Sequence, residues 1–425
     1  MKKYLLITVI TLLTVGVTAQ TLIATSNHPG ATANHNQRKI VRSSSGNIFV
    51  VFVDWFNQQN LIKGVMYDKN NGQWNNPFEI INGHNPTLSI SNENIIHLLY
   101  ESNDPITKIR HMSTDNFINW TDSFVVSDTS FKCKLPVADM DESGNLNVFY
   151  KQTNEDFTES LIYTRVNGDS LIESKSIVTK SEINDIAIAN HLQYFNNYLY
   201  FAIQYNQDSL QFYFTENLME NFDTLYTAIG QQPCITFNSF WEYSTDFNCA
   251  RFLYIDPDTQ LVEIECFDLA VSDPNQLETF GLVEYVCVDD IAPPIGYSYL
   301  FVEGGWIFHG FSYGVSWQWN EIMETVSGLQ ISNPSIAYKK FNFEYIDFIW
   351  MDGSGYNFDI YYMRDEKHIW LGIDDEEEGK GFSILGHPNP FSEQLTINVS
   401  VKEENIVPVI EIYNSGSQLI KLLDV

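Results

Sequence analysis

A short motif recurs along the whole chain. Seven times, a turn rich in Asn, Ser or Gly is followed by a short run of aromatic and β-branched residues. Five clear copies start at Asn47, Asn94, Asn145, Asn197 and Asn248, and two looser copies start at Ser298 and Glu344. Successive starts are 46 to 52 residues apart. This repeat constrains the fold far more than it constrains the activity.

The period fits one four-stranded unit of a β-propeller. Four strands of five or six residues and their turns need about 40 to 50 residues. The composition agrees, because 44% hydrophobic and 14% aromatic residues can fill a large all-β core. We therefore expect an all-β fold, with a seven-bladed propeller over residues 20–373. Six blades are the alternative if the run at Ser298 is an insertion.

Proline marks the start of several of these units. Pro86, Pro136, Pro233 and Pro334 each stand just before a short apolar stretch that precedes the main hydrophobic run. Proline fits at the first residue of a strand, where its missing N–H donor costs least. We expect these stretches to be the opening strands of their blades.

The first residues have the pattern of a secretory signal peptide. Lys2 and Lys3 precede an apolar run, and small residues occupy Val17, Thr18 and Ala19, where a signal peptidase cleaves. The run is too short for a retained membrane span, and no later stretch reaches the length of one. We expect cleavage after Ala19 and a soluble protein outside the cytoplasm.

A charged linker and a small second module end the chain. Residues 374–381 are acidic and glycine-containing, so we expect a domain boundary there. Residues 382–425 contain Pro-Asn-Pro-Phe at 388–391 and Ile-Tyr-Asn at 412–414. These motifs resemble the type A C-terminal sorting domain of the type IX secretion system, a small β-sandwich-like module. Such domains continue through further strands where this chain stops at Val425, so the resemblance implies a partial domain.

The sorting-domain resemblance also implies a location and a partner. It implies a Bacteroidetes-type bacterium, and a protein that is secreted or attached to the outer membrane at the cell surface. The partner would then be the type IX secretion machinery. The alternative is an ordinary C-terminal β-hairpin.

One turn resembles the Asp-box of sialidase-type propellers, whose pattern is Ser-x-Asp-x-Gly-x-x-Trp. Ser113, Asp115 and Trp120 match it, and Phe117 replaces the glycine. The Ser and Asp side chains of such a box hold the amides of the turn, and the Trp packs between strands. The resemblance implies a structural role for these residues.

The five cysteines would enter an oxidising compartment, where pairing is permitted. A hairpin centred on Pro257 and Asp258 would place Cys249 opposite Cys266, within disulfide reach. Two buried free thiols are the alternative. The pairing of Cys133, Cys234 and Cys287 stays open. The sequence has no Cys/His spacing of a zinc site and no phosphate-binding loop, so we expect neither metal nor cofactor.

Charge and motifs narrow the function to two classes. The formal net charge of −31 argues against nucleic acid as a partner. Asp54, Glu101 and Asp352 end strands and are weak candidates for ligand binding at a propeller mouth. We expect a protein that binds a glycan, peptide or protein partner. The alternative is a sialidase-like glycoside hydrolase, which needs three arginines around a carboxylate, and only six arginines are present. The catalytic residues are unknown, and whether the chain is an enzyme stays open, leaning to no.

Overall fold

The structure is a computed structural model. It describes residues 20–141, 143–190, 199–215, 222–237, 249–267, 270–277, 282–289, 298–311, 331–337, 345–353, 357–366, 382–387, 396–401, 409–413 and 419–424. The expected signal peptide at residues 1–19 and the expected linker at residues 374–381 lie outside these residues.

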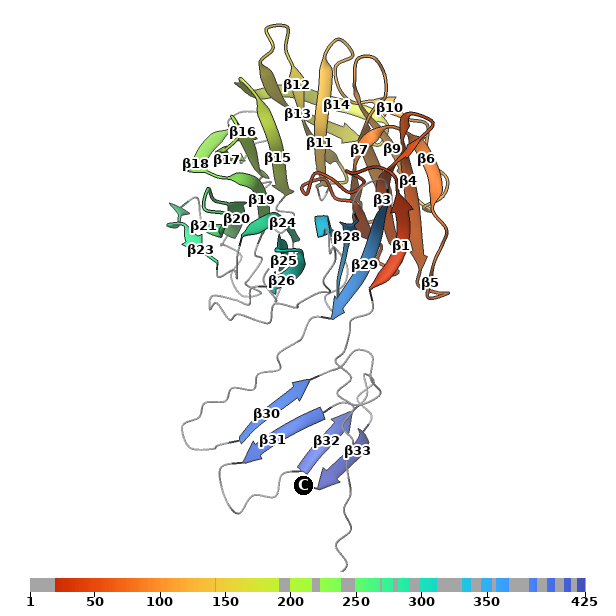
Figure 1. Ribbon diagram of the computed structural model, residues 1–425, viewed down its shortest axis with the longest axis vertical. Coiled ribbons are helices and arrows are strands. Elements are labelled where there is room, and N and C mark those ends of the chain that lie inside the picture. Colours follow the sequence, from red (N-terminus) through yellow and green to blue (C-terminus); the bar gives the residue numbers. More distant parts are fainter. Residues whose placement is uncertain are drawn as a thin grey trace, which may run out of the picture. The chain divides into compact units, whose positions relative to one another are not determined.

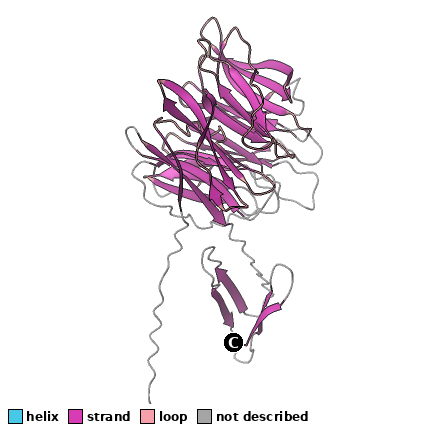
Figure 2. Ribbon diagram, turned by 90° about the vertical axis from the view of Figure 1, so that its right-hand side faces the viewer, coloured by secondary structure: helices cyan, strands magenta, loops and turns pink. Residues whose placement is uncertain are grey.

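The described residues form an all-β protein, and residues 19–365 are one compact unit built as a seven-bladed propeller (Figures 1 and 2). No helix in the described part of the chain is long and apolar enough to cross a membrane. Blade 1 consists of β2 (Ile40–Arg42), β3 (Ile48–Phe56), β4 (Gln59–Asp68), β5 (Gln73–Trp74) and β6 (Phe78–Asn82), and blade 2 of β7 (His84–Ile90), β8 (Ile96–Glu101), β9 (Ile109–Thr114) and β10 (Phe124–Val125). Blade 3 consists of β11 (Lys132–Met140), β12 (Leu146–Thr153), β13 (Glu159–Asn167) and β14 (Ser170–Lys180). Blade 4 consists of β15 (Ile183–Asn190), β16 (Leu199–Tyr205), β17 (Ser209–Thr215) and β18 (Asp223–Ile229).

Blades 5 to 7 complete the ring. Blade 5 consists of β19 (Gln231–Phe237), β20 (Cys249–Ile255), β21 (Leu261–Phe267), β22 (Ala270–Val271) and β23 (Asn275–Gln276). Blade 6 consists of β24 (Val283–Asp289), β25 (Ser298–Glu303) and β26 (Trp306–Phe311). Blade 7 consists of β27 (Ile331–Ile336), β28 (Tyr345–Asp352), β29 (Phe358–Glu366) and β1 (Thr21–Ser26). Neighbouring strands within each blade are antiparallel.

The seven repeated runs are the second strands of the seven blades. They correspond to β3, β8, β12, β16, β20, β25 and β28. Adjacent blades pack against both faces of these strands, so most of their residues are apolar. The run at Ser298 forms β25 of blade 6, which confirms the seven-bladed prediction and excludes the six-bladed alternative.

The first strand of the chain closes the ring. Strand β1 pairs antiparallel with β29 and so becomes the outermost strand of blade 7. Each pair of neighbouring blades in the described residues shares an apolar cluster, including blades 7 and 1, where Ile349 and Ile360 meet Val50 and Phe52. The propeller is therefore held by interfaces between blades rather than by one central core.

The innermost strands carry a β-bulge next to their proline. Asn85, Leu135, Gln232 and Asn333 precede the four prolines and have left-handed φ angles of 48°, 53°, 53° and 50°. The pairing register shifts at each of these positions. The prolines therefore lie within their strands, at the bulge rather than at the first residue, and the bulge removes the need for their N–H.

The hairpin that was expected to place Cys249 opposite Cys266 has a different register. Ile255 pairs with Leu261, which leaves a five-residue turn in which Thr259 has a φ of 62°. Cys249 therefore lies opposite Phe267, and Ala250 lies opposite Cys266. A shift of one residue moves a side chain to the other face of the sheet. Cys133 and Cys234 are buried free thiols, and Cys266 and Cys287 are buried as well.

The turn between β9 and β10 differs from an Asp-box. Oδ1 of Asn116, not Asp115, accepts the amides of Ile118 at 3.1 Å and Asn119 at 2.8 Å. Asp115 is exposed, and the Ser113 amide donates to Thr121 Oγ1 at 2.9 Å. The structural role expected of Trp120 fits its position, because its ring lies 5.7 Å from that of Phe49 in blade 1.

Beyond residue 366, four described strands belong to a second compact unit. Strand β30 (Phe382–His387) pairs with β31 (Thr396–Val401), and β32 (Val409–Tyr413) pairs with β33 (Leu419–Asp424), both antiparallel. Ile412 and Tyr413 of the Ile-Tyr-Asn motif lie in β32. The Pro-Asn-Pro-Phe motif lies outside the described residues.

Candidate functional site

One end of the propeller collects the turns that could meet a ligand. Every innermost strand starts at the same end of the ring, and successive strands of a blade alternate in direction. The turns between second and third strands, and the connections that enter each innermost strand, therefore lie at that same end. We call this end the entry face. Strand β1 also ends there, because it runs antiparallel to the third strand of blade 7.

The middle of the entry face is occupied by residues 27–39, which connect β1 to β2 and which we call the central segment. Figure 1 shows it in red, running from β1 into the middle of the ring. Its backbone joins blade 1, where Val53 N donates to Ala31 O at 2.9 Å, and blade 2, where Leu88 N donates to Arg38 O at 2.8 Å.

Side chains of the central segment reach further innermost strands. Thr32 Oγ1 donates to Asn333 O of blade 7 at 3.0 Å. Gln37 Nε2 donates to Pro136 O of blade 3 at 2.9 Å, and Lys39 Nζ donates to Pro86 O of blade 2. The bulges explain this pattern, because they break the regular ladder at the start of the innermost strands and leave carbonyls there for the segment.

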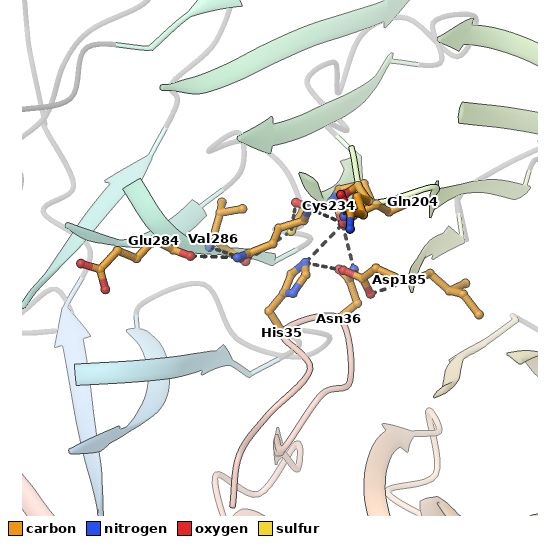
Figure 3. A network of polar contacts seen from close by, with 11 residues as sticks. His35, Asn36, Asp185, Gln204, Cys234, Glu284 and Val286 are labelled. Atoms are coloured by element: carbon orange, nitrogen blue, oxygen red, sulfur yellow. Dashed lines mark hydrogen bonds and ion pairs between the residues drawn. The ribbon is translucent and has the colours of Figure 1, made fainter. Parts of the chain in front are cut away.

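A histidine and an asparagine of the central segment bind blades 4 and 5 (Figure 3). His35 Nε2 lies 3.3 Å from Asp185 Oδ2 and 3.4 Å from Pro233 O. Asn36 Nδ2 donates to Pro233 O at 2.8 Å and to Asp185 Oδ1 at 3.3 Å. Burial raises the pKa of Asp185, and the neighbouring His35 opposes that effect. A histidine beside a carboxylate can exchange protons, but here both groups hold the segment in place.

Gln232 extends this network to blade 6. Its amide N donates to Gln204 Oε1 of blade 4 at 2.9 Å, and its Nε2 donates to Glu284 O of blade 6 at 2.8 Å (Figure 3). Its Oε1 accepts from Val286 N at 3.4 Å. Through its backbone and its side chain, Gln232 thus connects blades 4, 5 and 6 at a bulge.

Glu101, one of the three predicted binding residues, connects blades 2 and 3. It is fully buried, and its Oε1 accepts from Leu135 N at 2.9 Å and Asn85 Nδ2 at 2.7 Å. Its Oε2 lies 2.9 Å from His84 Nε2. Glu159 repeats the contact to the next blade by accepting from Ile183 N at 2.6 Å. Glu101 therefore joins blades.

Asp54, near the end of β3 in blade 1, and Asp352, the last residue of β28 in blade 7, are the other two predicted residues. Asp54 accepts from Asn27 N at 2.8 Å, Trp55 N at 2.9 Å and Lys63 Nζ at 2.7 Å. Although burial alone would raise the pKa of Asp54, these donors together lower it. Asp54 therefore anchors the start of the central segment. Asp352 is half-buried at the end of β28.

All six arginines pair with carboxylates of this chain. Their partners lie within 2.5 to 3.5 Å: Arg38 with Asp139, Arg42 and Arg364 with Asp347, Arg110 with Asp104, Arg165 with Asp141, and Arg251 with Glu263 and Glu265. They are distributed over several blades. The structure does not assemble the three arginines that a sialidase-like site would need.

Large apolar side chains stand exposed on the entry face, at the turns between second and third strands. Blade 1 presents Trp55 and Phe56, blade 2 presents Ile106, and blade 3 presents Phe157, with exposed fractions of 48%, 53%, 45% and 84%. We call these four residues the apolar rim. The Trp55 ring lies 6.4 Å from that of His28 in the central segment. The sequence signal that could have found Trp55 and Phe56 is their place directly before the Asn57-Gln58 turn.

Phe157 combines exposure with an unfavourable backbone. Its φ is 65°, a left-handed conformation that favours Gly or Asn over a bulky residue. The turn is held by Phe157 N donating to Asn154 O at 3.1 Å, and Thr158 Oγ1 donating to Asp156 Oδ1 at 2.6 Å. Neither the backbone nor the core explains a phenylalanine here.

Two buried histidines form a separate pair inside blade 2. His97 Nδ1 lies 2.9 Å from His111 Nε2. Burial lowers the pKa of His97 to about 4, and burial together with the nearby His97 lowers that of His111 to about 3. No group of three or more potential metal-binding side chains occurs in the part of the chain that the structure describes.

Comparison with known proteins finds solved structures that share the propeller fold. No protein-family model and no curated protein matches this sequence. Among solved structures, the BP39L lectin from Burkholderia pseudomallei has a TM-score of 0.58 at 13% identity, covering 79% of this chain and 97% of that chain. A PL25 ulvan lyase has a TM-score of 0.55 at 10% identity, covering 81% and 96%. The sialidase Hz136 has a TM-score of 0.48 at 9% identity, and this chain spans only 64% of it. At these identities the likeness shows the fold alone.

Proposed function

We propose that this protein is a secreted propeller that binds a glycan on the entry face without catalysis. The observation that carries the proposal is Phe157, which is 84% exposed at a φ of 65°. Strain and exposure of this kind are retained where a residue serves function rather than stability. Aromatic rings bury large areas, and their faces suit the C–H faces of sugar rings.

The structural neighbours support a saccharide ligand. By name, one is a lectin, and the lyase has also been solved bound to the saccharide -[GlcA(1-4)Rha3S]-. Folds host many functions, so these names support the proposal only together with the apolar rim. Exposed apolar groups that share one face of a protein mark binding sites.

Sialidase-like hydrolysis has less support. That chemistry needs arginines free to hold the carboxylate of the substrate, whereas each arginine here holds a carboxylate of the protein itself. Recruiting one would leave a buried or half-buried carboxylate unpaired, which is costly. We therefore favour binding over hydrolysis.

The test is a glycan array probed with residues 20–425 as the wild type, as Phe157→Ala and as Ile118→Ala. Phe157→Ala should weaken binding about tenfold, which corresponds to about 1.4 kcal/mol of lost contact. Ile118→Ala is the control, because Ile118 is also an exposed apolar residue, at 63%, but lies on a turn of blade 2 at the end opposite the entry face. Equal binding by the wild type and Phe157→Ala would refute the role of the rim. Turnover of a bound glycan would refute the absence of catalysis.

We further propose that the protein is exported by the type IX secretion system. The support is the pattern of residues 1–19 and the two sorting motifs within residues 382–425. A chain truncated after Ile373 should fold but stay in the periplasm. Normal export of the truncated chain would refute the proposal that the type IX system exports this protein.

A further inference from the structure

The turns of the entry face carry negative charge around the apolar rim. Carboxylates occupy the second-to-third-strand turns of four consecutive blades: Asp104 in blade 2, Glu155 and Asp156 in blade 3, Asp208 in blade 4, and Asp256 and Asp258 in blade 5. The same turns contain one lysine, Lys108, and no arginine. Glu155 and Asp156 directly precede Phe157, so a ligand on that ring lies beside two acidic side chains.

Three basic groups near these turns, Lys63, Lys151 and Arg110, are engaged with carboxylates of the protein. Lys63 Nζ lies 2.7 Å from Asp54 Oδ2, and Lys151 Nζ lies 3.0 Å from Glu159 Oε1. Arg110 lies 3.5 Å from Asp104. In these turns a sulfate or uronate group would meet six carboxylates against one lysine, Lys108, in a protein whose net charge is −31.

The same carboxylates are poorly arranged to select a cation. Asp156 Oδ1 accepts from Thr158 Oγ1 at 2.6 Å, and Asp256 Oδ1 accepts from Gln260 N at 2.8 Å. Asp and Asn side chains that hold their own turn amides are common turn-forming devices. Asp156 and Asp256 therefore hold their own turns, and the negative charge of all these turn carboxylates repels anions.

The rim also extends over three blades. Packed sheets lie about 10 Å apart, so turns on blades 1 and 3 are separated by roughly 20 Å. This span is wider than one sugar ring. A ligand that touches Trp55 and Phe157 together must be a chain of several residues.

From these observations, and resting on the proposed glycan binding, we propose that the ligand is an uncharged polysaccharide chain lying across blades 1 to 3. Its sugar rings stack on the apolar rim, and the acidic turns exclude sulfated and uronic polysaccharides. The specificity therefore differs from that of the neighbour solved with a glucuronate- and sulfate-containing saccharide.

The test is affinity electrophoresis of residues 20–425 in gels containing one polysaccharide each: neutral β-glucan, mannan or xylan, anionic alginate or carrageenan, and cationic chitosan. We expect retardation by at least one neutral polymer, equal at 20 and 500 mM NaCl, and lost in Phe157→Ala. Retardation should grow with oligomer length when competing oligosaccharides are used.

A charge variant separates the inference from the proposed function. The double variant Glu155→Gln, Asp156→Asn keeps the turn acceptors, so binding of the neutral polymer should change less than twofold while alginate binding rises. Strong binding of alginate, carrageenan or chitosan by the wild type, weakened by salt, would overturn the uncharged ligand and leave glycan binding intact. No retardation by any polymer would overturn both.

Discussion

The buried histidine pair of blade 2 makes stability depend on pH in a predictable direction. His97 and His111 share one hydrogen bond of 2.9 Å, in which one nitrogen donates and the other accepts. If both rings were protonated, both nitrogens would be donors and the bond would be lost. Burial lowers the two pKa values to about 4 and about 3, against about 6.5 in an unfolded chain.

The sign follows from proton binding. A histidine with a lowered folded pKa is neutral in the native state, and the unfolded state takes up the proton first. Its stabilising contribution is complete above pH 6.5 and is lost as the pH falls below that value. Each such histidine contributes a slope of about 1.4 kcal/mol per pH unit. Between pH 6.5 and 5, the pair should lower the free energy of unfolding by about 4 kcal/mol, an order-of-magnitude figure.

The perturbation is His97→Gln, measured by urea unfolding at pH 7.5 and at pH 5.0. The variant keeps one buried histidine, so its loss of stability over this range should be about 2 kcal/mol smaller than that of the wild type. Groups that titrate elsewhere contribute equally to both proteins and cancel in the difference. Equal pH dependence in the two proteins would refute the reasoning, because it would show that His97 does not titrate as a buried neutral group.

Three further changes test the contacts between blades. Glu101→Ala should lower the free energy of unfolding in urea by about 3 to 5 kcal/mol, because it leaves buried donors unpaired. The control Glu155→Ala should change that free energy by no more than about 0.5 kcal/mol. Equal effects of the two substitutions would contradict the role of Glu101. Trp120→Ala should cost about 2 to 4 kcal/mol, since half-buried Trp120 packs on Phe49, and a loss under about 1 kcal/mol would count against that packing. Deletion of residues 20–26 removes β1 and opens blade 7, so a folded monomer with unchanged thermal stability would disprove ring closure by this strand.

The sequence alone determined the parts of this protein that depend on local pattern. The second strand of a blade is mostly apolar on both faces, because a neighbouring blade packs against each face. The seven apolar runs therefore predicted seven blades. The looser run at Ser298 was still readable, because it keeps the spacing of its neighbours. Packing of Trp120 between strands was also predictable, since a large aromatic side chain in a turn gains most by burial.

Predictions that depended on one residue of register were less secure. The placement of Cys249 opposite Cys266 assumed a hairpin centred on Pro257 and Asp258, and the five-residue turn shifted the pairing by one position. In the β9–β10 turn, Asn116 rather than Asp115 holds the amides, because either short polar side chain can do so and only the backbone path decides which one is aimed correctly.

The tertiary structure alone decided what lies at the centre of the entry face. Thr32 contacts Asn333, 301 positions away in sequence, and His35 contacts Asp185 in blade 4. Such contacts leave no period in the sequence, since each is made once by one segment that enters a ring of seven blades. Glu101 was visible as an acidic strand end, but only the neighbouring bulge at Leu135 shows that it joins blades. Closing the ring brings distant positions together, and that is why the architecture could be read from the repeat while the role of each polar side chain could not.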